Sequence, residues 1–386
     1  MTMHKRKSPA IDLGKIPSPC FVLEEELLIR NLELLQTVSQ RSGAKILCAL
    51  KGYSMWSTFP LVQQYLTGGT ASSLNEARLI FEEMGTKAHT CCPVYFEDEF
   101  EEIQSISSHI TFNSVQQYHK FKNRLEVGTI QYAIRINPEY SEVDTDLYNP
   151  CMPGSRLGMT AKQFGEVLPD GISGLHFHAL CEQNADSLVN VLKNVEDKFG
   201  HFLPGLSWIN FGGGHHITRA DYDVDLLVDT IVAFREKYRI EVYLEPGEAV
   251  GWQTGYLVST VEDVVEANGI KTAILDVSFS AHMPDCLEMP YQPMIWGAAS
   301  EAINGKHIYR TGGQTCLAGD FVGYYSFDQP LHPGDQLIID DMIHYTMVKT
   351  TFFNGVRHPS IGIWTKDQNF KLLRTFSYSD YKNRLS

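Results

Sequence analysis

Short apolar runs recur along the first two thirds of the chain and alternate with segments of helical periodicity. Eight runs have the length and β-branched content of buried strands, at residues 45–50, 69–73, 88–92, 110–114, 131–137, 174–180, 207–213 and 241–247. Between them lie amphipathic segments: residues 73–85 end in glycine, and residues 223–238 begin with an aspartate suited to helix capping. Eight strands that alternate with helices predict a (β/α)8 TIM barrel.

After about residue 253 the apolar positions follow a period of two. Residues 253–278 contain "ANGIK", which is typical of a hairpin turn, and residues 307–316 and 334–355 continue the β pattern. "SPCFVLEEE" (18–26) predicts a strand that joins this sheet before the first helix. We therefore expect an α/β protein with the barrel in residues 24–253 and an antiparallel β domain formed by residues 1–23 and 254–386.

Composition limits the partners of the protein. Hydrophobic residues make up 43% and charged residues 20% of the 386, as in a soluble globular protein, and no apolar run is long enough to span a membrane. The basic N-terminus lacks the apolar stretch of a signal peptide. The net charge, 32 − 46 = −14, argues against nucleic acid and favours a cationic substrate.

The eight cysteines show neither metal-ligand spacing nor a disulfide framework. We therefore expect the reducing cytoplasm as the compartment, and no metal.

Polar residues and glycines that could take part in catalysis or ligand binding stand where the predicted strands end. They are Lys51, Ser72, Ser73, Asn113, His178, the run Gly212–Gly214, and Glu245. Active sites of such barrels gather at the carboxyl ends of the strands, so we expect these residues to lie together.

Each of these residues has more than one interpretation. Lys51 is either a reactive amine or a lysine that extends toward solvent. The glycines either bind a phosphate or form a tight turn. Glu245 could hold a pyridinium proton, act as a general base or balance a lysine. His176 and His178 could be metal ligands, or one stacking imidazole and one core histidine.

Taken together, the lysine, the glycines and the carboxylate favour pyridoxal phosphate (PLP). Lys51 would form a Schiff base, the glycines would hold the phosphate, and Glu245 would keep the ring nitrogen protonated. A metal-dependent barrel hydrolase would use the histidines but leaves the glycines unexplained. A non-catalytic PLP-binding protein would need neither Cys316 nor the β domain.

Six motifs resemble, in order, those of the fold-type III (alanine racemase-like) PLP-dependent decarboxylases, which include ornithine and diaminopimelate decarboxylases. They are "ALKGYS", "FHA", "FGGG", "EPGE", "QTCLAGD" and "HYTMVKTTFFNG", and the resemblance covers nearly the whole chain. It implies that Lys51 is the Schiff-base lysine, that His178 stacks on the cofactor ring and that Glu245 pairs with the ring nitrogen. It further implies that Tyr345 helps the glycines to bind phosphate.

The same resemblance implies that two subunits share each active site. Cys316 would project into the partner's site and protonate the carbanion left by CO2, while Asp320 would help to hold the substrate's distal amine. The enzyme would then be a head-to-tail homodimer. Asp285 could also bind an amine, or it could be a solvated loop charge.

Departures from the family pattern concern the substrate. "HALCEQ" replaces the usual "HxGS", Glu248 stands in place of an arginine, and Leu317 stands where diaminopimelate decarboxylases have an acidic residue. These variants resemble the carboxynorspermidine/carboxyspermidine decarboxylase branch, whose products are norspermidine and spermidine. The sequence does not rank these two substrates. A diaminopimelate- or ornithine-type decarboxylase is the alternative, and a racemase of this fold would have arginine in place of Glu245.

Overall fold

The structure, a computed structural model, describes residue 9 and residues 11–386. The basic N-terminus, which the sequence assigns to the β domain, otherwise lies outside the described residues. Contacts divide the chain into two compact units, one formed by Arg30–Val250 and the other by residues up to Ile29 together with Gly251–Ser386. The sequence placed these divisions at 23/24 and 253/254.

The first unit is a closed barrel of parallel strands, which confirms the predicted fold. Its strands are β2 (Lys45–Ala49), β3 (Gly68–Ala71), β4 (Ala88–Cys92), β5 (Ser107–Phe112), β6 (Gln131–Arg135), β7 (Ile172–His176), β8 (Trp208–Asn210) and β9 (Glu241–Leu244). Several end before the predicted runs do, so the polar residues and glycines that follow stand in the loops.

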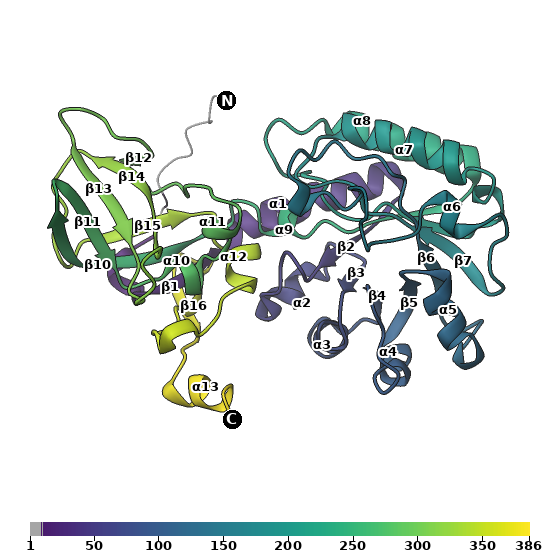
Figure 1. The fold of residues 1–386 in the computed structure, drawn as a ribbon, viewed down its shortest axis with the longest axis horizontal. Helices are drawn as coiled ribbons and strands as arrows, with labels where there is room; N and C mark the ends of the chain where they lie inside the picture. The colour runs from purple at the N-terminus through teal and green to yellow at the C-terminus, as the bar shows by residue number, and fades with distance from the viewer. Residues whose placement is uncertain (1–8, 10) are drawn as a thin grey trace. The chain divides into compact units, whose positions relative to one another are not determined.

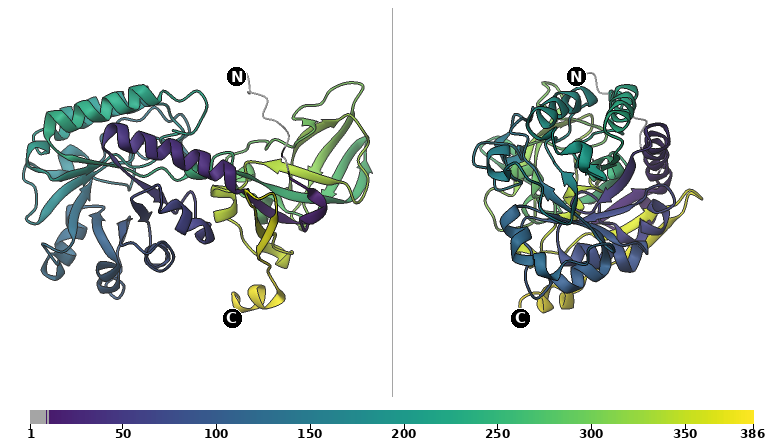
Figure 2. Two further views of the ribbon diagram at one scale, coloured as in Figure 1. Left: turned by 180° about the vertical axis from the view of Figure 1, so that it is seen from behind. Right: turned by 90° about the vertical axis from the view of Figure 1, so that its right-hand side faces the viewer.

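Helices form the outer layer of the barrel unit (Figures 1 and 2). They are α1 (Glu25–Ser42), α2 (Phe59–Val62), α3 (Leu74–Leu79), α4 (Phe100–Ile106), α5 (Val115–Phe121), α6 (Ala161–Phe164), α7 (Ala185–Phe199), α8 (Val224–Tyr238) and α9 (Glu248–Gly251). The predicted cap is present, since Asp223 accepts a hydrogen bond from the N–H of Leu226. Ser73 caps α3 in the same way, by accepting from the N–H of Glu76. The predicted helix 73–85 ends in a π-helical turn, Ile80–Met84, before Gly85 in the left-handed region.

The amino end of the barrel is filled by aromatic rings and closed by an ion pair. The rings of His89 and His109 stack 3.7 Å apart, beside Trp208 and Tyr243. Lys45 Nζ lies 3.0 Å from a carboxylate oxygen of Glu241. The two charged side chains at this end therefore have partners within the protein, whereas Nδ1 of the buried His89 ring has no hydrogen-bond partner.

The second unit is a mostly antiparallel sheet. Its strands are β1 (Cys20–Glu24), β10 (Gly255–Ala267), β11 (Ile270–Leu275), β12 (Ala298–Ala299), β13 (His307–Gly312), β14 (Phe321–Phe327), β15 (Gln336–Asp340), β16 (Ser360–Trp364) and β17 (Phe370–Arg374). The order is β12-β14-β13-β11-β10-β1-β16-β17, and β15 also pairs with β10. The pairs β1–β16 and β11–β13 are parallel.

Two local predictions for this sheet are confirmed. The N-terminal strand β1 pairs with β10, as "SPCFVLEEE" suggested. Asn268 and Gly269 turn the β10–β11 hairpin with φ of 52° and 78°, the left-handed values that a tight hairpin turn requires.

The β pattern expected over residues 334–355 is wrong beyond Asp340. Asp341 has φ 62° and its carboxylate accepts a hydrogen bond from the N–H of Gln253, so the chain leaves the extended conformation there. Tyr345 consequently stands on a short helix, α12 (Tyr345–Val348), rather than on a strand. The unit also contains α10 (Phe279–His282), α11 (Asp285–Glu288) and α13 (Tyr378–Asn383).

Within the part of the chain that the structure describes, no helix has the length and apolar character needed to cross a membrane.

Candidate active site

Lys51 lies in the loop that follows β2, and its side chain is exposed at the carboxyl end of the barrel. The loops after β2 and β9 are joined by a hydrogen bond from the N–H of Ala49 to the carbonyl of Pro246, at 3.2 Å. A Cβ at Gly52 would lie 2.8 Å from the backbone nitrogen of Glu248, and one at Gly247 would lie 2.9 Å from the carbonyl of Ala49. Glycine at both positions therefore allows the loop of Lys51 to contact the loop that carries Glu245.

The glycine run after β8 lies between the loops that follow β7 and β9. Gly212 and Gly214 have φ of 72° and 83°, and a Cβ at Gly213 would lie 2.5 Å from the carbonyl of Glu245. The N–H of Gly212 donates to Asn210 Oδ1 at 2.8 Å, and that of Gly213 donates to His178 Nδ1 at 2.9 Å. Turn geometry and close packing therefore explain in large part why glycine occupies these three positions.

His178 is fixed by that contact with the glycine run. Because Nδ1 accepts a hydrogen bond from a backbone N–H, the ring is neutral and carries its proton on Nε2. Burial, together with the positive charges of Lys51 and Arg135, holds its pKa well below the usual value. Lys51 and His178 therefore lie at the same end of the barrel, in the loops that follow β2 and β7.

Glu245 directly follows β9 and is buried, with 7% of its surface exposed. Its Oε1 accepts a hydrogen bond from Asn210 Nδ2 at 2.7 Å. Burial raises the pKa of this carboxyl group to about 7, against the opposing effect of hydrogen bonds from Thr70 and Asn210 and of the charge of Arg135. A carboxyl group in this state would be stabilised as an anion by a cation placed against it.

His176 is the last residue of β7, and its Nε2 lies 3.6 Å from Glu245 Oε2. It is 2% exposed, and neither ring nitrogen has a hydrogen-bond partner within the protein. Burial and the charge of Arg135 keep its pKa well below the usual value. Among the described residues there is no group of three or more His, Cys, Asp or Glu side chains that could hold a metal ion.

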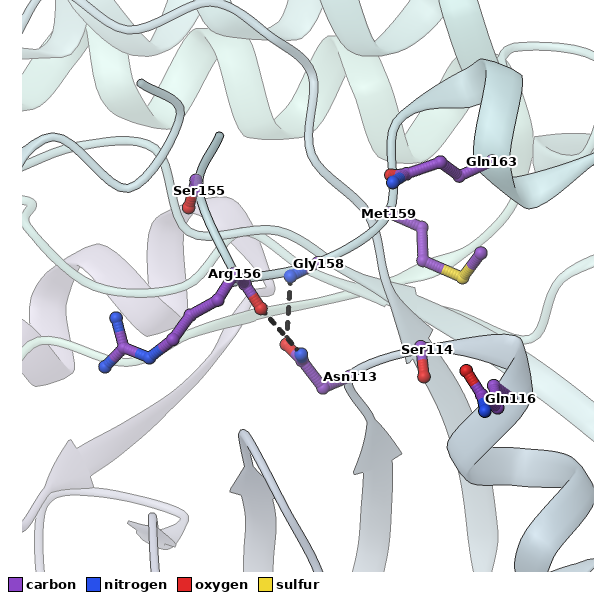
Figure 3. A pocket seen from close by; sticks show the side chains of 8 residues that line it. All are labelled: Asn113, Ser114, Gln116, Ser155, Arg156, Gly158, Met159 and Gln163. Carbon is purple, nitrogen blue, oxygen red and sulfur yellow. Dashed lines mark hydrogen bonds between the residues drawn. The ribbon is translucent and has the colours of Figure 1, made fainter. Parts of the chain in front are cut away.

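Asn113 anchors a loop at the same end of the barrel. Its Nδ2 donates to the carbonyl of Arg156 at 2.8 Å, and its Oδ1 accepts from the N–H of Gly158 at 2.9 Å (Figure 3). A polar cavity of about 320 Å³ lies beside this loop, lined by Asn113, Ser114, Gln116, Ser155, Arg156, Gly158, Met159 and Gln163.

Ser72 and Ser73 stand between β3 and α3 in the barrel unit, where Ser73 caps α3. The remaining predicted residues belong to the sheet unit, except Glu248. Cys316 is exposed and Asp320 is buried in the loop between β13 and β14. Asp285 and Glu288, both on α11, form ion pairs with Lys349. Tyr345 begins α12, and Glu248 is half-buried at the start of α9 in the barrel unit.

Three residues at these places were missed by sequence reasoning. Asn210, on the neighbouring strand β8, donates to Glu245, and Thr70, on β3, helps to lower the pKa of that carboxyl group. Asn354 Oδ1 accepts the N–H of Cys316 at 2.7 Å. Asn210 lies in the predicted strand run 207–213 and Asn354 lies in the motif "HYTMVKTTFFNG", but nothing in the sequence shows their partners.

A family model described as "Pyridoxal-dependent decarboxylase, C-terminal sheet domain" matches residues 20–343. The chain therefore belongs to the pyridoxal-dependent decarboxylases. It is a carboxy-lyase, and its cofactor is pyridoxal 5'-phosphate.

Similar proteins narrow the branch of the family. The carboxyaminopropylagmatine decarboxylase of Synechocystis sp. is 50% identical, with 97% of this chain and 96% of that protein covered. The carboxynorspermidine/carboxyspermidine decarboxylase of Campylobacter jejuni is 46% identical, with 96% and 99% covered. The crystal structure of carboxynorspermidine decarboxylase complexed with norspermidine, also from C. jejuni, matches with a TM-score of 0.90 at 44% identity and covers 96% of this chain and 100% of that one.

The residues at the barrel end fit the cofactor. Lys51 would supply a primary amine for the cofactor aldehyde, and Glu245 is a buried carboxyl group whose anion a protonated ring nitrogen would stabilise. In the glycine run, the N–H groups of Gly212 and Gly213 donate to protein acceptors. This leaves Gly214 as the member of the run suited to bind the phosphate through its N–H.

Proposed function

We propose that the protein releases CO2 from a carboxylated polyamine, and that carboxynorspermidine and carboxyspermidine are converted to norspermidine and spermidine. The observation that carries this proposal is the 46% identity, over nearly the full length of both chains, to an enzyme named for these two substrates. The net charge of −14 suits a polycation. Bound PLP supplies an electron-accepting ring for the charge left when CO2 departs.

The geometry of the barrel end supports the proposed cofactor contacts of the barrel residues, and the family resemblance supports that of Tyr345. Lys51 holds the cofactor aldehyde carbon, and His178 lies against the ring. Glu245, oriented by Asn210, accepts a hydrogen bond from the ring nitrogen. The glycine run, chiefly Gly214, binds the phosphate together with Tyr345.

The proposed proton donor is Cys316, which acts in the site of a partner subunit. It gives its thiol proton to the substrate carbon that has lost CO2. Its exposure in this chain is consistent with such a role. The functional unit is then a head-to-tail homodimer with shared active sites.

Three further residues bear on the choice of substrate. Leu317, 45% exposed and apolar, offers nothing to a second amino-acid head group, which disfavours diaminopimelate. Asp285 already pairs with Lys349, so an incoming substrate ammonium would have to compete with that lysine. Glu248 is the other carboxylate proposed for the polyamine.

Carboxyaminopropylagmatine is the second candidate substrate, because the relative named for it is 50% identical. It would present the same carboxyaminopropyl group to the cofactor and differ from the other substrates in its distal guanidinium. The cytoplasmic location is also part of this proposal, supported by the eight unpaired cysteines.

The test begins with the absorption spectrum of the purified protein, before and after borohydride reduction, and with mapping of the modified lysine. We expect a yellow protein whose cofactor is trapped on Lys51. CO2 release is then compared for the three carboxylated polyamines, with diaminopimelate and ornithine as controls. A higher kcat/KM for the guanidine-bearing substrate would favour the second candidate, and a preference for either control would contradict the proposal.

A further inference from the structure

The loop that carries Cys316 is tied down along its length. The N–H of Gly313 donates to the carbonyl of Asp320 at 2.7 Å, and the N–H of Asp320 donates to the carbonyl of Leu317 at 3.0 Å. The N–H of Gln314 donates to the carbonyl of Val277 at 3.0 Å. These bonds fold residues 313–320 onto the body of the sheet unit while the side chain of Cys316 stays exposed.

The Asp320 carboxylate is the centre of this loop, and it is only 5% exposed. Its Oδ1 accepts from the N–H of Ser280 at 3.0 Å and from Ser278 Oγ at 3.2 Å. Its Oδ2 accepts from Thr315, from the N–H at 3.1 Å and from Oγ1 at 2.5 Å. Four donors use the acceptor capacity of one carboxylate, so a substrate amine could bind only by displacing one of them.

Asn354 holds the next peptide unit. Its Oδ1 accepts the N–H of Cys316 at 2.7 Å. Asn354 has φ 59°, a left-handed conformation that asparagine tolerates better than most residues. Thr315 and Cys316 are therefore bound, one to Asp320 and the other to Asn354.

We propose that Asp320 and Asn354 are positioning residues for the Cys316 thiol, and that Asp320 acts through this loop instead of binding substrate. The inference rests on the proposed role of Cys316 as proton donor. A thiol that must deliver its proton to one carbon needs a defined position, and small displacements of a reacting group cost large factors in rate. Thr315 lies between the carboxylate and the thiol and transmits the constraint.

Asn354→Gly is the sharpest variant, because glycine adopts the left-handed backbone readily and the substitution removes the side chain that carries the acceptor. Asn268→Gly is the matched control: it is also a left-handed asparagine, but it lies in the β10–β11 hairpin turn. Asp320→Asn keeps the shape and removes the charge. If that variant fails to fold, Asn354→Gly still carries the test.

Two readouts are needed. Without cofactor, the alkylation rate of Cys316 by iodoacetamide is followed by mass spectrometry, with Cys316→Ser to identify the signal. We expect Asn354→Gly to change this rate by about threefold or more, and to lower kcat about tenfold with little change in KM. Asn268→Gly should leave both unchanged.

The decisive comparison places Asn354→Gly in the Cys316→Ser background. A residue that acts only through the thiol has no further effect once the thiol is gone, so kcat should not fall again. Equal losses in both backgrounds, or an unchanged alkylation rate, would overturn the positioning role. If Cys316→Ser alone keeps full kcat, the proposed proton donor is wrong, while the alkylation result still decides whether Asn354 positions the loop.

Discussion

The neighbouring strands β2 and β9 have a lysine and a glutamate at each of their two ends, but the surroundings of these side chains differ between the ends. Strand β2 begins with Lys45 and is followed by Lys51, while β9 begins with Glu241 and is followed by Glu245. At the amino end, Lys45 binds Glu241 at 3.0 Å and the hydroxyl of Tyr243 at 3.2 Å. At the carboxyl end, Glu245 accepts a hydrogen bond from Asn210 and lies close to His176, whose ring nitrogens have no hydrogen-bond partner.

The two carboxylates differ accordingly in their proton affinity. Burial tends to raise the pKa of Glu241, but the hydrogen bond and charge of Lys45 outweigh it and the pKa is lowered. Burial dominates at Glu245 and raises its pKa to about 7. At the amino end the charges of Lys45 and Glu241 pair with each other, which suits an end that contributes to stability. At the carboxyl end the buried groups Glu245 and His176 could bind a ligand.

The largest expected effect is the loss of activity when the carboxyl-end lysine is removed. Lys51→Ala should lower kcat by about a thousandfold or more and abolish borohydride trapping, because the cofactor aldehyde loses its amine. Lys45→Ala is the matched control, and its kcat should stay within about twofold because an exposed ion pair contributes little. Steady-state CO2 release measures both. Similar activities for the two variants would contradict the functional distinction between the ends.

The barrel was predictable because its evidence is local and repeated. Each strand is a short apolar run, and the count of eight survives errors of a few residues at the ends. The run 207–213, for example, contains only the three-residue strand β8, since Gly212 and Gly214 have positive φ. The β pattern over 334–355 failed where one residue, Asp341, takes a left-handed conformation that no local pattern indicates.

The candidate site was predictable only in part. Lys51, His178 and Glu245 were found because each follows a recognisable strand, and strand ends meet at one end of a barrel. Asn210 and Asn354 were missed because their partners, Glu245 and Cys316, lie 35 and 38 residues away. Long-range hydrogen bonds of this kind leave no periodicity in the sequence.

A second prediction concerns stability against pH in the cofactor-free protein. The folded pKa of Glu245, about 7, lies above its ordinary value of 4.5, so the folded state binds the proton more tightly than the unfolded state. Its contribution to the free energy of unfolding is therefore present below pH 4.5 and falls as the pH rises to about 7. The difference between wild type and Glu245→Gln should fall by roughly 3 kcal/mol over this range.

Urea unfolding of both proteins between pH 4.5 and 8 measures this difference. Buried histidines with lowered pKa that do not contact this carboxyl group, such as His178, act in the opposite direction in both proteins and cancel. Glu241→Gln is the control: the pKa of Glu241 is lowered from 4.5, so its contribution is present above pH 4.5 and lost only below it, and partial exposure keeps it small. The difference between wild type and this variant should therefore stay nearly constant over the measured range. A flat difference for Glu245→Gln would mean that its carboxyl group is stabilised as an anion without the cofactor.

The smallest expected effect concerns the amino-end ion pair itself. The side chains of Lys45 and Glu241 are 42% and 54% exposed, so solvent screens their attraction. A double-mutant cycle with Lys45→Met and Glu241→Gln should give a coupling energy of about 0.2–1 kcal/mol in urea unfolding, decreasing with salt. A coupling of several kcal/mol would mean that this pair is a major stabilising element of the barrel. A small coupling energy, with full activity in the double variant, would mean that the ion pair adds little to the stability of this end. The packing of the rings of His89, His109, Trp208 and Tyr243 would then stabilise it.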